Sequence, residues 1–123
     1  MKLIHEKLTK QIIDAAFEVH KELGCGFLEA VYQEVLEIEF KLRGIPFESQ
    51  KLLDLKYKGT KLKKKYIPDF LVFEKIILEI KAESQITNID EAQLHNYLKG
   101  SELKVGLLIN FGNTKLQIKR IVK

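Results

Sequence analysis

The sequence predicts an α/β fold in which helices pack on a mixed β-sheet. Two amphipathic helical segments lead the chain, a region rich in β-forming residues follows Pro46, and one more helix precedes the last two predicted strands. This order (helix, helix, three strands, helix, two strands) is typical of a mixed sheet covered by helices. The 123 residues, 46% of them hydrophobic, suit one globular domain spanning residues 1–123.

Apolar residues at helical spacing predict the two N-terminal helices. Over residues 4–23 they recur every three or four positions, as one face of a helix requires, and Gly24 supplies a stop. Gly26 reopens the chain, and a second apolar stripe covers residues 28–42 until Gly44 ends it. Two helices therefore precede the sheet.

Three antiparallel strands are predicted next. Residues 53–57 alternate between apolar and polar side chains, Lys58 and Gly59 offer a turn, and residues 66–73 are rich in β-formers. Residues 76–80 follow almost at once. They are apolar at nearly every position, which favours a central strand covered on both faces.

A third helix is expected over residues 88–99. Asn88 with Glu91 three positions later resembles a capping box, and Gly100 provides an exit. Two closing strands then complete the sheet, at residues 105–111 and 116–122.

Several kinds of protein are disfavoured by the composition. No stretch approaches the roughly 20 apolar residues that span a bilayer, and the first residues lack the apolar core of a signal peptide. We therefore expect a cytoplasmic protein with no membrane partner. The single cysteine, Cys25, lacks both a disulfide partner and a Cys-His motif for thiol catalysis. The three histidines form no recognisable metal cluster, and no P-loop is present.

The positive charge is mild overall but strongly clustered. A net charge of +4 does not by itself indicate a nucleic-acid binder. Within one fifteen-residue segment, however, stand Lys51, Lys56, Lys58, Lys61, Lys63, Lys64 and Lys65. Such a segment could follow a phosphate backbone or form a solvated hairpin that guards an exposed edge. The members expected to hold nucleic acid are Lys61, Lys63, Lys64 and Lys65.

Asp69, Glu79 and Lys81 form the most informative group of polar residues. Asp69 and Glu79 stand on neighbouring predicted strands, and Lys81 shares a face with Glu79 because strand side chains alternate with period two. Two carboxylates can hold a Mg²⁺ or Mn²⁺ ion that also accepts phosphate oxygens. Lys81 can orient the attacking water, stabilise the phosphoryl oxygens or act as a base.

A register condition tests this arrangement. Asp69 lies directly opposite Glu79 across an antiparallel ladder only if the paired residue numbers sum to 148. We therefore predict an odd-length loop centred near Glu74, or a bulge beside Pro68, which cannot donate a ladder hydrogen bond.

A structural explanation of the same residues is available: Asp69 as a turn residue, with Glu79 and Lys81 as a surface pair. Glu79, however, lies inside the apolar run of residues 76–80, where an unpaired carboxylate would cost several kcal/mol. That position calls for a partner, and a metal with Lys81 would be suitable.

Three further residues could join the site. Glu29 opens the second helix, where it serves either as an ordinary first-turn acid or as a third carboxylate for the metal. Gln93 and Tyr97 share a face of the third helix. Gln93 could reach a water or a phosphate, or cap a strand end, and Tyr97 is by residue type more often part of a core.

Taken in order, these motifs resemble those of the small GxxExxY proteins, a group placed in the PD-(D/E)xK nuclease superfamily. The motif behind that name is present at residues 26–32. The likeness continues through residues 68–70, 79–81, 93–98 and 106–112, and spans about residues 12–122.

The resemblance implies a restriction-endonuclease-like αβββαβ core. It implies that Asp69, Glu79 and Lys81 are the nuclease signature and that Glu29 is a metal ligand. The pair on the third helix resembles the Gln-x-x-x-Tyr motif of RecB-like nucleases.

The sequence therefore predicts a Mg²⁺- or Mn²⁺-dependent nuclease that hydrolyses phosphodiester bonds, with DNA favoured over RNA. A homodimer is a reasonable expectation for cutting a duplex. The main alternative is a non-catalytic module that binds nucleic acid or a partner subunit on the same fold. A third possibility is an interaction protein whose polar cluster is a satisfied core network.

Overall fold

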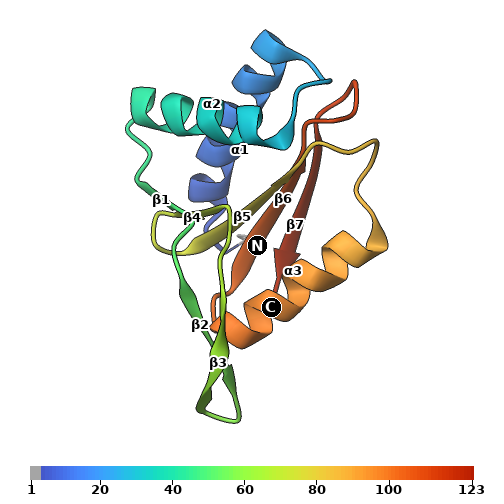
Figure 1. The fold of residues 1–123 in the computed structure, drawn as a ribbon. Coiled ribbons are helices and arrows are strands. Elements are labelled where there is room, and N and C mark those ends of the chain that lie inside the picture. Colours follow the sequence, from blue (N-terminus) through green and yellow to red (C-terminus); the bar gives the residue numbers. More distant parts are fainter. Residues whose placement is uncertain (1–3) are drawn as a thin grey trace.

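The computed structural model describes residues 4–123, which form three helices and seven strands (Figure 1). In chain order these are α1 (Glu6–Leu23), α2 (Glu29–Leu42), β1 (Phe47–Ser49), β2 (Leu53–Tyr57), β3 (Thr60–Tyr66), β4 (Phe70–Val72), β5 (Ile76–Lys81), α3 (Asn88–Ser101), β6 (Val105–Asn110) and β7 (Gln117–Val122).

Five strands form one mixed sheet in the order β1-β4-β5-β6-β7. Strands β1, β4 and β5 are successive antiparallel neighbours, β6 runs parallel to β5 after the α3 crossover, and β7 is antiparallel to β6. The predicted αβββαβ core is therefore confirmed. Strand β5 is central and largely buried on both faces, as its apolar run predicted.

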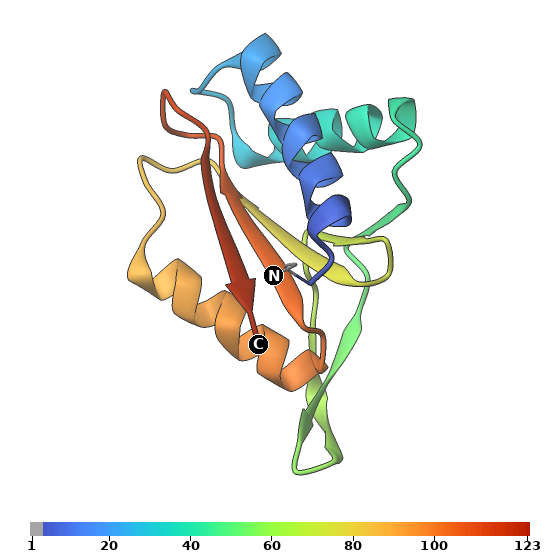
Figure 2. The same ribbon diagram turned by 180° about the vertical axis from the view of Figure 1, so that it is seen from behind.

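The prediction that residues 53–57 supply the first strand of this core is wrong. That place belongs to β1, whose three residues are too few to show an alternating pattern. Strands β2 and β3 pair with each other in a separate two-stranded sheet. This hairpin projects beyond the rest of the protein in both views (Figures 1 and 2).

Residues 66–73 are likewise not one strand. Tyr66 ends β3 by pairing with Leu53, whereas Phe70 begins β4 by pairing with Ser49. Pro68 lies between the two strands, and its missing N–H suits a break in the ladder.

The register between β4 and β5 meets the predicted condition. Phe70 pairs with Leu78 and Val72 with Ile76, so each pair sums to 148, and the connecting loop has the three residues 73–75. Continuing this register by one position places Asp69 opposite Glu79.

Helix ends differ from the expected positions at three places. Helix α1 begins at Glu6, after His5 in a left-handed conformation, and not at residue 4. The capping box of α3 is formed by Thr87 and Asp90, one position before the predicted pair, because these two residues have the same favourable spacing. Helix α3 also continues through Gly100.

The reason for this continuation lies in packing. A Cβ atom on Gly100 would stand 2.7 Å from Leu55 Cδ2, so the glycine lets α3 approach β2 closely. The helix ends instead at Glu102, which takes the left-handed conformation with φ 66°.

The sheet lies between α1 and α2 on one face and α3 on the other (Figure 2), with an apolar layer on each face. Even-numbered residues of β5, namely Ile76, Leu78 and Ile80, join a core with α1 and α2, whereas Ile77 joins a second core under α3. Burying each such side chain contributes roughly 1.5–3 kcal/mol. By the same alternation, Glu79 and Lys81 face the α3 side.

Residues 4–123 include no helix that is both long and apolar enough to cross a membrane.

Candidate active site

Asp69 and Glu79 form a carboxylate pair at the point where β5 leaves the core. Both are half-buried, and the backbone N–H of Ile80 donates to Asp69 Oδ2 at 2.8 Å. The two carboxyl groups influence each other's ionisation. Sequence periodicity and the three-residue loop together produce this convergence.

Burial and mutual repulsion make this pair reluctant to ionise. Burial, and then the charge of Asp69, raise the pKa of Glu79 to about 7. Burial also raises the pKa of Asp69, against the opposing effect of the Ile80 N–H. A bound cation would relieve both costs.

Lys81 lies on the same face, two residues beyond Glu79. Its Nζ is 3.8 Å from Asp90 Oδ1 on α3. Its positive charge acts on a whole group of surrounding carboxyl groups. It opposes the rise in pKa caused mainly by burial or hydrogen bonding at Glu29, Asp69, Glu79 and Glu83, and it contributes to the lowered pKa of Asp90. Because five carboxyl groups surround a single lysine, the site favours the binding of a further cation.

Glu83 and Asp90 are members of this group that the sequence prediction missed. A hydrogen bond with Asp90, and then burial, raise the pKa of Glu83 to about 7. Glu83 Oε1 is buried and, among residues 4–123, has no hydrogen-bond partner. Glu83 continues the period-two series of Glu79 and Lys81, which was the available signal, but the strand ends before it.

The loop that carries Glu83 is fixed to β6 by Asn110. This fully buried side chain accepts from the Glu83 N–H at 3.0 Å and donates to the Glu83 carbonyl at 2.8 Å. Gly112 also donates to Asn110 Oδ1, at 3.1 Å. The acidic group is therefore held by a rigid backbone.

Glu29 stands exposed in the first turn of α2. Burial, and then the charge of Asp69, raise its pKa, and Lys81 opposes this effect. Glu29 thus belongs to the same electrostatic neighbourhood as the signature residues. Its predicted role as a third metal ligand stays a prediction.

An aromatic stack adjoins the other side of Glu79. The Tyr66 hydroxyl donates to Glu79 Oε1, and the Tyr66 ring stacks on Tyr97 with centroids 3.8 Å apart. Gln93 Nε2 reaches the Tyr97 hydroxyl at 3.4 Å. The predicted pair on α3 is therefore joined to the site through Tyr66, a residue that no sequence pattern singled out.

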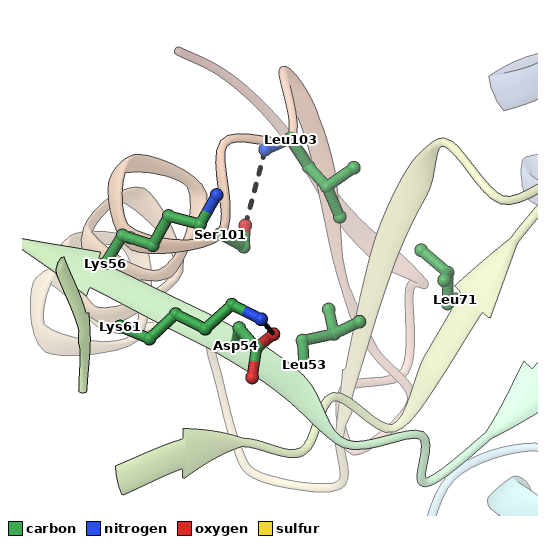
Figure 3. Close-up of a pocket in the computed structure, with 8 residues that line it drawn as sticks. Leu53, Asp54, Lys56, Lys61, Leu71, Ser101 and Leu103 are labelled. Atoms are coloured by element: carbon green, nitrogen blue, oxygen red, sulfur yellow. Dashed lines mark hydrogen bonds and ion pairs between the residues drawn. The ribbon is translucent and has the colours of Figure 1, made fainter. Parts of the chain in front are cut away.

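Asp54 on β2 forms ion pairs with two lysines of the cluster, and Figure 3 shows its pair with Lys61. Lys61 Nζ lies 3.3 Å from Asp54 Oδ2, and Lys65 Nζ bonds to Asp54 Oδ1. Hydrogen bonds from Lys65 and then Lys61 lower the pKa of Asp54. Within residues 4–123, Lys63 and Lys64 make no ion pair. Two of the four lysines predicted to hold nucleic acid thus already share one carboxylate, which offsets one of their two positive charges.

The donor set suits a divalent metal that brings part of its own coordination shell. Among residues 4–123, no three His, Cys, Asp or Glu side chains form a ready metal-binding group. Mg²⁺, however, usually retains several waters and takes one or two carboxylates plus substrate oxygens. The Asp69–Glu79 pair could provide two such ligands, and a metal would offset the cost of ionising carboxyl groups whose pKa burial raises.

A five-stranded mixed sheet that presents two carboxylates and a lysine at one strand end defines a nuclease-like domain. The chain belongs to the PD-(D/E)XK nuclease superfamily, whose family model matches residues 6–121. The recognition of this superfamily is confirmed, as is the restriction-endonuclease-like fold. Nucleases of this superfamily generally use divalent metals such as Mg²⁺.

A solved structure, described as "Crystal structure of SSO0001", is similar to this chain with a TM-score of 0.52 and 18% sequence identity. The match covers 91% of this chain but 66% of the other, so this chain spans just under two thirds of that structure's length. At this identity the likeness concerns the fold. No curated protein matches the sequence.

Proposed function

We propose that this protein is a metal-dependent nuclease that hydrolyses phosphodiester bonds, with DNA as the favoured substrate and RNA as a possible one. The observation that carries the proposal is the half-buried Asp69–Glu79 pair beside Lys81. A purely structural role gives little reason to bury two adjacent carboxylates in a sheet at this energetic cost.

Asp69 and Glu79 would hold a Mg²⁺ or Mn²⁺ ion, and Glu29 would complete its surroundings. When bound, such an ion supplies positive charge where negative charge builds on the phosphoryl oxygens. The Ile80 N–H fixes one oxygen of Asp69, and Tyr66 fixes one oxygen of Glu79. Both carboxylates are thus oriented before any ligand arrives.

Lys81 is the protein's own cation at the reacting centre. Its ammonium group is 3.8 Å from Asp90, which restrains it without consuming all three donors. Lys81 would position the attacking water or stabilise the phosphoryl oxygens. Gln93 and Tyr97 would orient the same water or an adjacent phosphate.

Nucleic acid would approach along the projecting hairpin. Lys63 and Lys64 are exposed on β3 and available for phosphate oxygens. We also propose, from the motif at residues 26–32, that the chain is a GxxExxY protein within the superfamily. A homodimer would supply the two sites that cutting both strands of a duplex requires.

The decisive test is cleavage of labelled single- and double-stranded DNA and RNA by the purified protein. We expect cutting with Mg²⁺ or Mn²⁺, none with EDTA, and a loss of about 100-fold or more in Lys81→Ala and Glu79→Gln. Matched controls are Lys75→Ala and Glu74→Gln, in the exposed loop before β5, which should cut normally.

Intact substrate in the presence of either metal, combined with measurable binding, would contradict the nuclease. That result would favour the non-catalytic binding module.

A further inference from the structure

A small pocket adjoins Asp69. It measures about 240 Å³, lies between the first turns of α2 and the end of β1, and is lined in part by two of the proposed metal ligands, Glu29 and Asp69. The residues that line it are Glu29, Ala30, Gln33, Gln50 and Asp69. Asp69 therefore forms one wall of a space large enough for a single planar group, such as a nucleobase.

Two glutamines are fixed around Asp69 in this pocket. Gln33 Nε2 donates to the Asp69 carbonyl at 3.1 Å, and the backbone N–H of Gln50 donates to the same carbonyl at 3.3 Å. Gln50 holds φ at +56°, a conformation that costs a non-glycine residue free energy and is often kept at functional sites.

The bonds to Asp69 determine which atoms face the pocket. A carbonyl oxygen and a carboxylate can only accept, so Gln33 and Gln50 must turn their amide N–H groups toward Asp69. Their amide oxygens remain as acceptors. With the carboxylate of Glu29 nearby, the pocket is rich in acceptors and negative in charge.

The amide oxygens of Gln33 and Gln50 favour a hydrogen-bond donor as their partner. Among nucleic-acid groups, the exocyclic amino groups of adenine and cytosine are donors, whereas thymine offers a carbonyl oxygen and a methyl group at the same edge. Glutamine and glutamate side chains are suitable partners for these amino groups.

We infer that the Gln33–Gln50 pocket is a base-recognition subsite, which takes the amino-bearing base of the nucleotide next to the scissile phosphate and discriminates against thymine. This inference rests on the proposed nuclease function, since it places a nucleotide beside Asp69. It makes Gln33 and Gln50 determinants of specificity, separate from the residues that hold the metal.

The test is binding of fluorescently labelled single-stranded dA, dC and dT dodecamers to the wild-type protein, with Ca²⁺ in place of Mg²⁺ and measured by anisotropy. We expect dA and dC to bind about fivefold to tenfold more tightly than dT, the worth of about one hydrogen bond. Gln33→Leu should abolish this difference. Gln50→Gly should do the same while preserving the positive φ. Gln11→Leu, at an exposed position on α1, should leave it unchanged.

Equal binding of the three oligonucleotides would overturn the subsite, as would a preference that persists in both pocket variants. The readout is a ratio between bases, so a general loss of affinity in a variant does not imitate the expected result. Cleavage of all three oligonucleotides at equal rates with Mg²⁺ would overturn the subsite alone. Binding without any cleavage would overturn the proposed nuclease function. The ratio of dA and dC affinity to dT affinity would then decide by itself whether the pocket recognises a base.

Discussion

At the scale of single residues, Tyr66 decides how Glu79 is presented. Its hydroxyl donates to Glu79, while its ring is fixed against Tyr97. Burial, and then the charge of Glu79, raise the pKa of Tyr66 above its ordinary value, so the phenol stays a donor at physiological pH. Tyr66 is therefore a positioning residue for the proposed metal ligand.

Tyr66→Phe keeps the aromatic stack and removes only the hydroxyl. We expect the Mg²⁺ concentration for half-maximal cleavage to rise about 10-fold to 100-fold, the usual effect of removing a group that orients a metal ligand. The measurement is the cleavage rate across a Mg²⁺ titration. Tyr57→Phe, on the exposed part of the same hairpin, is the control. An unchanged Mg²⁺ requirement would contradict the positioning role.

At the scale of elements, the β2–β3 hairpin pairs an acidic side chain with lysines that the sequence alone presents as one basic cluster. Asp54 on β2 engages both Lys61 and Lys65 on β3. The ladder contains an irregularity between Asp54 and Lys56, which leaves extra residues on β3, Lys63 and Lys64 among them, without an opposite partner. One aspartate thus reduces the positive charge that the hairpin could offer to a phosphate backbone.

Asp54→Asn should therefore strengthen nucleic-acid binding. We expect duplex DNA affinity to rise about threefold to tenfold at 50 mM salt, with a steeper salt dependence, because two lysines become available to phosphates. Lys63→Ala and Lys64→Ala should each weaken binding and reduce the salt slope by about one. Anisotropy at several salt concentrations measures both quantities, and Lys41→Ala on α2 is the control. Weaker binding by Asp54→Asn would refute this account.

A second element-scale prediction concerns the loop between β5 and α3. A Cβ atom on Gly112 would fall on the backbone of Glu83 and Ala82, which cannot move without displacing the loop. Gly112→Ala should lower the free energy of unfolding by about 3 kcal/mol. Gly100→Ala is the comparison, because its Cβ would meet only the flexible end of Leu55, and the helix propensity of alanine offsets the crowding. Urea denaturation of both variants tests this difference.

At the scale of the whole molecule, the acidic site costs stability. The pKa of Glu79 is raised to about 7 in the folded state, so the folded protein binds more protons than the unfolded chain between about pH 4.5 and 7. The contribution of Glu79 to stability is therefore complete below pH 4.5 and is lost as pH rises through 7.

The metal-free protein should accordingly lose stability as pH rises from 5 to 8. In Glu79→Gln this loss should be smaller by roughly 2 kcal/mol, following from about 1.4 kcal/mol per pKa unit with an allowance for partial exposure. Urea denaturation in EDTA at both pH values measures it.

At pH 8, Mg²⁺ should restore stability to the wild type, by roughly 3 kcal/mol at 100 times its dissociation constant, and far less to Glu79→Gln. Equal pH dependence in the two proteins would show that Glu79 does not carry this cost.

Much of the fold and the signature residues could be predicted from the sequence, because the relevant signals are local. The apolar run of residues 76–80 indicated a central strand. Period-two alternation placed Glu79 and Lys81 on one face, and the odd loop centred on Glu74 brought Asp69 opposite Glu79. Each of these inferences depends on residues within about a dozen positions of one another.

Other features were decided only by tertiary structure. The identity of the first core strand, the bond from Tyr66 to Glu79, and the Gln33–Gln50 pocket each depend on which segments lie side by side. Strand pairing and helix packing set those neighbours through burial and hydrogen bonding summed over many residues. A three-residue strand such as β1 has no periodicity to reveal it, and a lysine in sequence does not show which carboxylate will neutralise it. The sequence alone thus determined which carboxylates and lysine converge at the strand end, and the tertiary structure determined which residues surround them.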